Sequence, residues 1–484
     1  MVAVPAARVK LKRSPRREPE MLISSEKPAD NIHGCPATFR AARTPAQGFV
    51  TYGEKAMSPG PPSPLNRMPT GVRPCRGEIL AALSRVLDYM PSAGVPHHAR
   101  VAVLAARMSS FFRRADRLDT FYAGLIHDIG LLSEDRDPDR WFSMAEQANQ
   151  PLIRSHPLVG AQMVAALPEL LGVAEIILDH HECVNGHGYP RGRRGDEIPP
   201  GAQILRFAAT CDLVLREQTW PELISFLDAL RQRAGVQVEP SIADAGIEVL
   251  GDTGFYAQLL APEDVALLVQ STLHRLALED LVVTEPELTG LLELFAHTTD
   301  AHPADKIGHS RRVADLSVLV AMALGVPASE TAKIKWAALV HDIGLIAVPK
   351  ALLDKPGSLT KDELDEVRRQ VVKTEEFLSP VRGLEEVTAI AAAHGEAFDG
   401  SGYPRGLAGR GIPLGARIIA VCDTFDALTS HRPYREARDA GLAIDILVKG
   451  SGAVFDPDVV EAAVPALLIA RSAEEPQTVG AKAH

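Results

Sequence analysis

Residues 341–344 read His-Asp-Ile-Gly, and the same four residues stand at 127–130, 214 positions earlier. Each copy is followed at a matching distance by a histidine-containing stretch, His-His-Glu at 180–182 and His-Gly-Glu at 394–396. A Gly-x-Gly-Tyr-Pro stretch then completes each copy. A matched order of this length indicates two tandem copies of one domain rather than a chance motif.

The residues around these stretches have a helical pattern. An apolar run at 337–340 leads into the second His-Asp pair, which places that pair at the end of an expected helix. Thr360 and Glu363 have the spacing of a capping box, which starts a helix. Convincing alternating strands are scarce, so we expect an all-α fold made of two tandem helical bundles. Apolar residues recur at helical spacing at Ile79, Leu80, Leu83 and Leu87, and at Val313, Leu316, Val320 and Leu324.

The chain divides into four expected segments. These are a tail at 1–76, a first repeat at 77–275, a second repeat at 286–470, and a polar tail at 471–484. Residues 1–76 hold 12 of the 36 prolines and show no apolar periodicity, which predicts disorder. Their basic cluster could contact nucleic acid or anionic lipid, although a solvated tail is the simpler interpretation.

Composition narrows the functional class. The 484 residues are 46% hydrophobic and 23% charged, which is typical of a soluble globular protein, and no apolar run is long enough to span a membrane. The five cysteines are scattered without C-x-x-C spacing, which predicts a reducing, cytoplasmic environment. The net charge is −11, and residues 1–76 hold 13 Lys and Arg against 5 Asp and Glu, so the remainder carries −19. A body this acidic is not expected to bind nucleic acid generally.

The repeated histidines and aspartates indicate a metal site. Mixed imidazole and carboxylate ligands suit iron, manganese, zinc or nickel better than calcium. One carboxylate can also bridge two cations, and paired cations activate water and hold a phosphoryl group. The sequence therefore predicts a divalent metal ion whose identity stays open.

With these motifs in place, each repeat resembles an HD-GYP domain, a subgroup of the HD phosphohydrolases that hydrolyse the bacterial messenger cyclic di-GMP. The resemblance covers everything but the two tails and adds a further motif at 423–428 to the three above. It implies two HD-type helical bundles, a divalent metal cofactor, and a cyclic dinucleotide or another small phosphate ester as the partner.

The resemblance implies two metal positions in each repeat. In the second repeat, one metal has all four family ligands, which are His309, His341, Asp342 and Asp423. The other keeps only Asp342 and His394, because Gln370 and Gly395 stand where the family has histidines.

The first repeat shows the reverse loss. The second-type site is complete, with Asp128, His156, His180 and His181, and the early ligands His97 and His127 are present. The late aspartate is missing, because Ala209 stands opposite Asp423. Asp212, one helical turn further along, could reach the site instead. We expect His98 and His187 to be exposed neighbours without a role.

The resemblance also implies residues that contact substrate. Arg432 and Arg435 match the family's phosphate contacts, Tyr403 would contact a guanine base, and Asp305 is the acid that precedes the early histidine. The lysine that usually follows the His-Asp motif is replaced by Leu131 and Leu345. Glu182 and Glu396 could either orient an imidazole or lie on the surface.

Two functions remain open at this level. The first is a metal-dependent phosphodiesterase that opens cyclic di-GMP to the linear dinucleotide or to GMP. The lost ligands predict weak activity, and the set around Asp342 and His341 favours the second repeat as the catalytic unit. The alternatives are a degenerate protein that senses a cyclic dinucleotide or binds signalling proteins, and a phosphohydrolase that acts on another phosphate ester. The repeats could also have specialised, with the first regulating the second.

Overall fold

The computed structural model describes residues 74–92, 96–113, 115–133, 151–217, 228, 231–276, 283–301, 306–355, 357–430 and 437–474. The first repeat consists of α1 (Arg76–Ser92), α2 (His97–Ser109), α3 (Arg117–Ile126), η1 (Ile129–Ser133), α5 (Pro151–Val164), η3 (Pro168–Leu170), α6 (Leu171–Asp179), η4 (Gly195–Glu197), α7 (Pro200–Glu217), α9 (Pro240–Gly251), α10 (Thr253–Leu260) and α11 (Pro262–Leu276).

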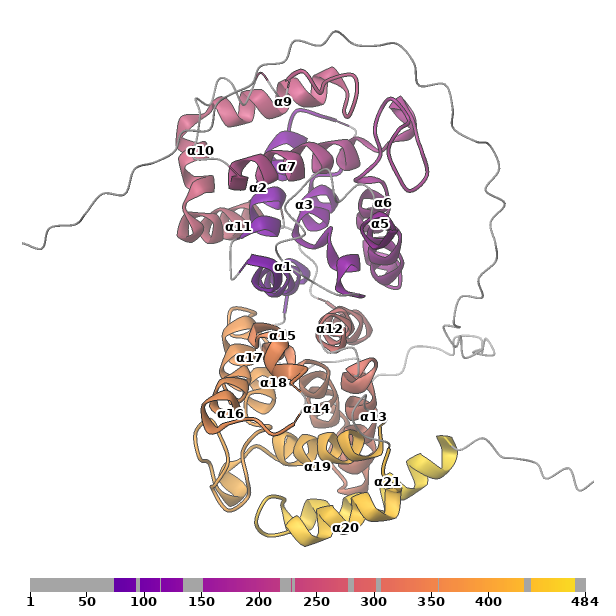
Figure 1. The fold of residues 1–484 in the computed structure, drawn as a ribbon, viewed down its shortest axis with the longest axis vertical. Coiled ribbons are helices and arrows are strands. Elements are labelled where there is room, and N and C mark those ends of the chain that lie inside the picture. Colours follow the sequence, from indigo (N-terminus) through magenta and orange to yellow (C-terminus); the bar gives the residue numbers. More distant parts are fainter. Residues whose placement is uncertain are drawn as a thin grey trace, which may run out of the picture. The chain divides into compact units, whose positions relative to one another are not determined.

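The second repeat follows the same plan. It consists of α12 (Glu285–Asp300), α13 (His309–Ala323), α14 (Ala328–Val340), η6 (Ile343–Ala347), α15 (Lys350–Leu353), α16 (Lys361–Arg368), α17 (Gln370–Leu378), α18 (Glu385–Ala391), η7 (Gly409–Gly411), α19 (Leu414–Thr429), α20 (Ala440–Gly450) and α21 (Pro457–Glu474). In each repeat the helix that begins with the early histidine packs against the helix that precedes the His-Asp pair, as α2 on α3 and α13 on α14 (Figure 1).

The all-α prediction is confirmed for the described residues. They contain helices and 3₁₀ turns, and their only β pairing consists of isolated bridges such as Asn185 with Arg194. The expected capping box is also confirmed, since the Thr360 side chain accepts from the Glu363 amide while the Glu363 carboxylate accepts from the Thr360 amide. The boundary between the repeats stays a prediction.

Two helices deliver the His-Asp pairs to the bundle interiors. Helices α3 and α14 end directly before His127 and His341, and their last turns are buried. The chain then enters a 3₁₀ turn, η1 or η6, which holds the aspartate beside its histidine. Burying the apolar helix ends thus fixes where both polar side chains emerge.

A glycine lets a second helix approach each His-Asp turn. A Cβ on Gly130 would lie 2.1 Å from the carbonyl oxygen of His156 on α5, and one on Gly344 would lie 1.8 Å from that of Gln370 on α17. Such distances are shorter than any real Cβ contact, so only glycine permits these crossings. The close approach brings position 156 or 370 beside the aspartate of the same repeat.

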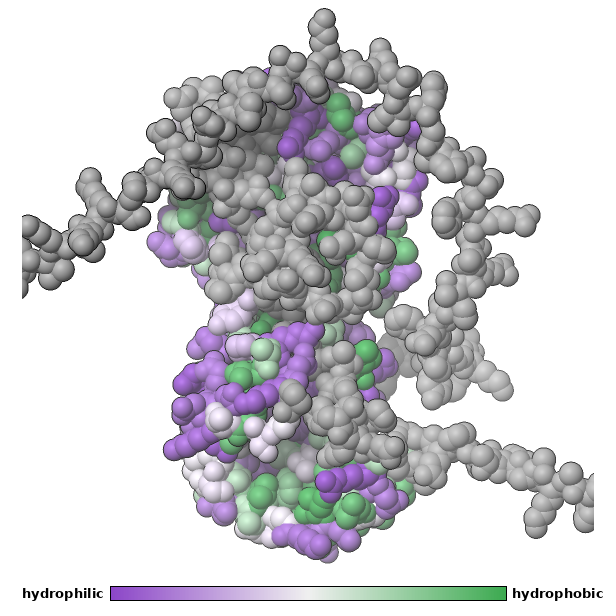
Figure 2. All heavy atoms as spheres, viewed as in Figure 1, coloured by the Kyte–Doolittle hydropathy of each residue, from purple (hydrophilic) through white to green (hydrophobic). Residues whose placement is uncertain are grey.

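Helix α16 lies on the surface and is polar. Helix α16 has no buried residue, and hydrophilic side chains dominate the area where it lies in Figure 2. No helix in the described part of the chain combines the length and the apolar character needed to cross a membrane. Residues 1–73 and 475–484 lie outside the described residues, so most of the expected N-terminal and C-terminal tails cannot be compared, and the cytoplasmic location stays a prediction.

Candidate metal centres

Five of the site histidines share one anchoring contact. In the first repeat the Nδ1 atoms of His127, His156 and His180 lie 3.1, 2.5 and 2.6 Å from the carbonyl oxygen three residues earlier. A carbonyl can only accept, so Nδ1 carries the proton and donates. The other ring nitrogen, Nε2, is thereby left as a lone-pair donor for a metal ion.

His341 and His394 repeat this arrangement in the second repeat. Their Nδ1 atoms each lie 2.7 Å from the carbonyls of Ala338 and Ala391. The Nε2 atom of His341 is buried and has no hydrogen-bond partner among the described residues. A buried lone pair without a donor is costly, and a cation would satisfy it.

Asp128 lies between two groups of histidines. Its Oδ2 atom is 3.3 Å from His127 Nε2 and 3.6 Å from His97 Nε2, while its Oδ1 atom is 3.4 Å from His156 Nε2 and 3.9 Å from His180 Nε2. The ligand atoms of His156, His180 and His181 also lie within 4.8 Å of one another. The structure therefore brings together all the sequence-predicted metal residues of the first repeat.

Asp212 does not join these ligands. Its carboxylate instead accepts from the far ring nitrogen of His97, Nδ1, at 2.6 Å, and from Arg100 at 2.5 Å. The suggestion that Asp212 reaches in as a substitute ligand is therefore wrong, because the side chain lies behind the imidazole. By accepting from Nδ1 it orients the His97 ring so that Nε2 faces Asp128, as carboxylates behind metal-bound histidines do.

The second repeat has the same carboxylate in the matching place. Asp426 lies 2.7 Å from His309 Nδ1 and 2.6 Å from Arg312. Helices α7 and α19 therefore align in the same way with the early histidine of their repeat, His97 or His309. Ala209 and Asp423, each three residues before these carboxylates, occupy matching positions.

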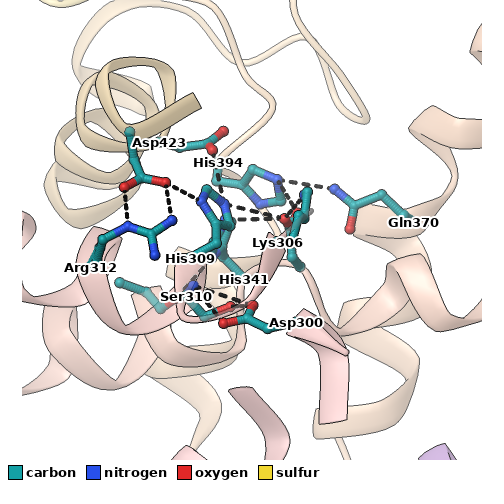
Figure 3. Close-up of polar contacts among 12 residues, drawn as sticks. Asp300, Lys306, His309, Ser310, Arg312, His341, Gln370, His394 and Asp423 are labelled. Atoms are coloured by element: carbon teal, nitrogen blue, oxygen red, sulfur yellow. Dashed lines mark hydrogen bonds and ion pairs between the residues drawn. The ribbon is translucent and has the colours of Figure 1, made fainter. Parts of the chain in front are cut away.

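The second repeat gathers the ligand set expected for one metal. Atoms of His309, His341 and Asp423 lie within 4.8 Å of one another, and His309 Nε2 is 3.2 Å from Asp423 Oδ1. Asp342 Oδ2 is 3.7 Å from His309 Nε2 and 3.5 Å from His341 Nε2. Figure 3 shows His309, at the start of α13, His341, after α14, and Asp423, on α19, turned toward one another.

In the second repeat, two potential metal ligands already have a protein partner. The Lys306 ammonium lies 2.5 Å from Asp342 Oδ2, and the Gln370 side-chain amide lies 3.0 Å from His394 Nε2 (Figure 3). The sequence motifs had marked Gln370 as a lost ligand, but they did not include Lys306. The available signal was a lysine three residues before His309, where the first repeat has Gly94.

The Gly-Tyr-Pro tyrosine packs differently in the two repeats. In the first, the Tyr189 ring stacks on His181 with 4.7 Å between centroids, and Arg154 lies over its other face. In the second, a Cβ on Gly395 would lie 2.6 Å from the Tyr403 ring, so the tyrosine fills the space that a histidine would need. Tyr403 and Tyr189 thus line the site in each repeat, and contact of Tyr403 with a guanine base stays a prediction.

Glu182 and Glu396 neither orient an imidazole nor lie on the surface. Both are buried, and each accepts backbone amides of the loop after Tyr-Pro, from Arg191 and Gly192 in one case and from Arg405 in the other. Both suggested roles are therefore wrong, and the carboxylates stabilise the loop instead.

His98 differs from its expected role as well. It is buried, and its ligand atom lies with those of His97, His127 and Asp128 within 4.8 Å. His187, in contrast, is exposed as expected. Three further candidates from the sequence, Asp305, Arg432 and Arg435, lie outside the described residues.

The pKa values of three buried histidines in the first repeat and of His309 in the second shift in opposite directions. Burial lowers the pKa of His127 and His181 well below the usual value and that of His180 to about 3, with neighbouring imidazoles adding to the effect. These rings are therefore neutral at neutral pH, which is the form that binds metal. Burial acts against protonation of His309 too, yet hydrogen bonds to Asp423 and Asp426 raise its pKa to about 9.

Asp128 and Asp342 are both ionised. Burial alone would raise the pKa of Asp128, but the surrounding imidazoles, chiefly His127, hold it well below the usual range. The pKa of Asp342 is likewise depressed despite burial, mainly by Lys306 and then by His341. The second carboxylate thus pairs with a lysine, whereas the groups that face the first, among the described residues, are imidazoles.

Comparison with known proteins assigns these features to one family. A family model described as the HD domain matches the chain twice, at residues 81–242 and 293–459. Over 318 residues the chain is 32% identical to the 3'3'-cGAMP-specific phosphodiesterase 3 of Vibrio cholerae. The aligned stretch covers 66% of this chain and 68% of that protein.

Two further similarities agree with this match. The chain is 45% identical over 153 residues to the cyclic di-GMP phosphodiesterase response regulator RpfG of Xanthomonas campestris, which covers 31% of this chain and 40% of that protein. A crystal structure of a cyclic GMP-AMP specific phosphodiesterase from V. cholerae superimposes with a TM-score of 0.58 at 24% identity, covering 82% of this chain and 99% of the other. That superposition supports the same overall fold.

Proposed function

The chain belongs to the HD-domain family of hydrolases, with the domain present twice, and we propose that it is a metal-dependent phosphodiesterase that opens a cyclic dinucleotide. The observation that carries this proposal is the Asp128 carboxylate, whose two oxygens face separate groups of histidine Nε2 atoms. Bound metal ions would supply an activated water and neutralise charge on the phosphate there.

The chain's own residues provide the rest of the proposed site. His97, His127, His156, His180 and His181 would hold the ions with Asp128. Burial keeps the rings of His127, His180 and His181 neutral, so these three need lose no proton to do so. The stacked Tyr189 and Arg154 would form a wall beside the phosphate. Arg206, whose charge contributes to the low pKa values of His180 and His181, would contact the phosphate in place of the lysine missing at Leu131.

We assign turnover to the first repeat, contrary to the preference drawn from the sequence. The support is that Lys306 already pairs with Asp342 and Gln370 with His394, so a cation entering the second repeat must displace an ammonium from its bridging carboxylate. Among the described residues, the groups paired with Asp128 are imidazoles, whose Nε2 atoms lie 3.3 to 3.9 Å from its carboxylate oxygens. The arginines that favoured the second repeat, Arg432 and Arg435, add no geometric support because they lie outside the described residues.

The second repeat has a second candidate role, which the Lys306–Asp342 pair favours. A site with a fixed ammonium and an incomplete metal set could bind a phosphodiester without cleaving it. The second repeat would then sense a cyclic dinucleotide while the first hydrolyses it. Binding of signalling proteins stays a prediction without geometric support.

The substrate class follows from the relatives, which are named for cyclic di-GMP and for 3'3'-cGAMP. The test is to load the full chain with Mn²⁺ or Fe²⁺, incubate it with each dinucleotide, and identify products by chromatography and mass spectrometry. We expect linear dinucleotide or mononucleotide from at least one of them. The absence of product at high enzyme concentration would reject the proposal.

The assignment to a repeat needs separate variants of the bridging aspartates. Asp128→Ala should abolish turnover, and Asp342→Ala should retain most of it. The matched control is Asp244→Ala, because Asp244 is exposed on α9. If Asp342→Ala lost activity while Asp128→Ala kept it, the second repeat would be the catalytic one.

A further inference from the structure

His98 is an imidazole for which neither the sequence nor the proposed function provides a role. Its side chain is only 4% exposed, and its Nε2 atom has no hydrogen-bond partner among the described residues. That atom lies 3.9 Å from Asp128 Oδ2, and the ring centroid is 4.9 Å from that of His127. A buried ring nitrogen thus faces the same carboxylate oxygen as His97 and His127.

The opposite edge of the ring is held in place. Asp88 Oδ1, on α1, accepts from His98 Nδ1 at 2.7 Å and from the His98 amide at 2.8 Å. This carboxylate–histidine arrangement fixes the tautomer with the proton on Nδ1 and directs the Nε2 lone pair inward, as it does for metal-bound histidines.

The second repeat has the same aspartate but no imidazole. Asp300 on α12 accepts from the Ser310 hydroxyl at 2.6 Å, and Ser310 occupies the position that His98 has in the first repeat. The aspartate is therefore common to both bundles, while the residue it orients differs.

This difference is paired with a second one. The first repeat has His98 and Ala209, whereas the second has Ser310 and Asp423. The shared register of α7 and α19 puts Ala209 where Asp423 supplies its carboxylate. Each repeat thus has one possible metal donor at these two positions. In the first repeat it is His98 on α2, and in the second it is Asp423 on α19.

We propose that His98 replaces the late aspartate as a metal ligand in the first repeat, so that His97, His98, His127 and Asp128 form a complete four-residue site. Ligands about 2.0–2.2 Å from one ion lie roughly 3 to 3.5 Å apart. The three Nε2 atoms, at 3.3, 3.6 and 3.9 Å from Asp128 Oδ2, need to move little to meet this spacing. The inference rests on the metal sites of the proposed function but not on its substrate.

The test measures metal binding rather than turnover. The full chain with Asp342→Ala, which impairs the second repeat, serves as the background. In it we compare His98→Ser, the control His187→Ser, and His98→Ser combined with Ala209→Asp. Mn²⁺ stoichiometry and affinity are measured by elemental analysis and by titration followed with electron paramagnetic resonance, while circular dichroism and melting confirm folding.

We expect two ions per chain in the background and in the His187→Ser control. His98→Ser should lose one ion or weaken its binding at least tenfold, and the added Ala209→Asp should restore it by rebuilding the ligand pattern of the second repeat. Unchanged binding in folded His98→Ser would overturn the inference, as would failure of the folded double variant to recover. Intact His98-dependent binding without hydrolysis of any cyclic dinucleotide would reject the proposed function and leave this inference standing.

Discussion

At the residue scale, the site depends on which ring nitrogen each histidine turns inward. Backbone carbonyls or carboxylates hold the Nδ1 atoms of His127, His97 and His98, so every Nε2 atom faces Asp128. The sequence predicted the imidazoles from their matched spacing. It could not predict the orienting partners, because Asp212 lies 115 residues from His97 and meets it only after α7 packs on α2.

The orienting role of Asp212 predicts a graded effect. Asp212→Ala should weaken one Mn²⁺ site about 10- to 100-fold, because the ring of His97 loses its carboxylate partner and part of its basicity. The measurement is a Mn²⁺ titration, with Asp244→Ala as the exposed control. Equal affinities for the two variants would show that Asp212 does not act through His97.

Lys306 gives a prediction of opposite sign. Lys306→Met should tighten Mn²⁺ binding by the second repeat, because the metal no longer competes with an ammonium for Asp342. An Asp128→Ala background isolates the second repeat for this titration, and Lys333→Met, a partner of two exposed glutamates, is the control. Weaker binding after removal of Lys306 would contradict the competition.

At the element scale, the decisive features are the close helix crossings. The sequence predicted the helices, the capping box at Thr360 and the helix ends before the His-Asp pairs, since all of these depend on local spacing. It did not explain why glycine follows each pair. The explanation needs the crossing of η1 with α5, where Gly130 meets the His156 carbonyl and His156 thereby reaches Asp128.

This crossing predicts a linked loss of stability and metal binding. Gly130→Ala should lower the unfolding free energy by about 1–3 kcal/mol through overpacking, and should also remove an ion by moving His156 away. Gly251→Ala is the control, because a Cβ there has no neighbour within 4 Å. Thermal melting and elemental analysis of both variants check the prediction. A stable Gly130→Ala protein with its full metal content would disprove it.

At the scale of the whole molecule, two copies of one domain have lost different donors. The sequence identified the repeats and their complementary losses, because motif positions can be counted along the chain. It favoured the second repeat for catalysis, since neither the burial of His98 nor the pairing of Lys306 with Asp342 can be read from spacing. The tertiary contacts decide that imidazoles face Asp128, whereas an ammonium pairs with Asp342.

Metal removal should therefore destabilise mainly the first repeat. A ligand at 100 times its dissociation constant adds about 2.7 kcal/mol of stability, so Mn²⁺ should raise the melting temperature of chelator-treated protein. Asp128→Ala should lose most of this increase, whereas Asp342→Ala should keep it. An increase of the same size in both variants would mean that neither repeat binds preferentially.

The most direct test of the account is the anomalous diffraction of Mn²⁺-loaded crystals of the full chain. The account predicts two peaks beside Asp128, one on the side of His97, His98 and His127 and one on the side of His156, His180 and His181, about 3.5–4 Å apart as in two-metal phosphoesterases. Absence of any peak within bonding distance of Asp128, in crystals that contain the metal, would contradict it.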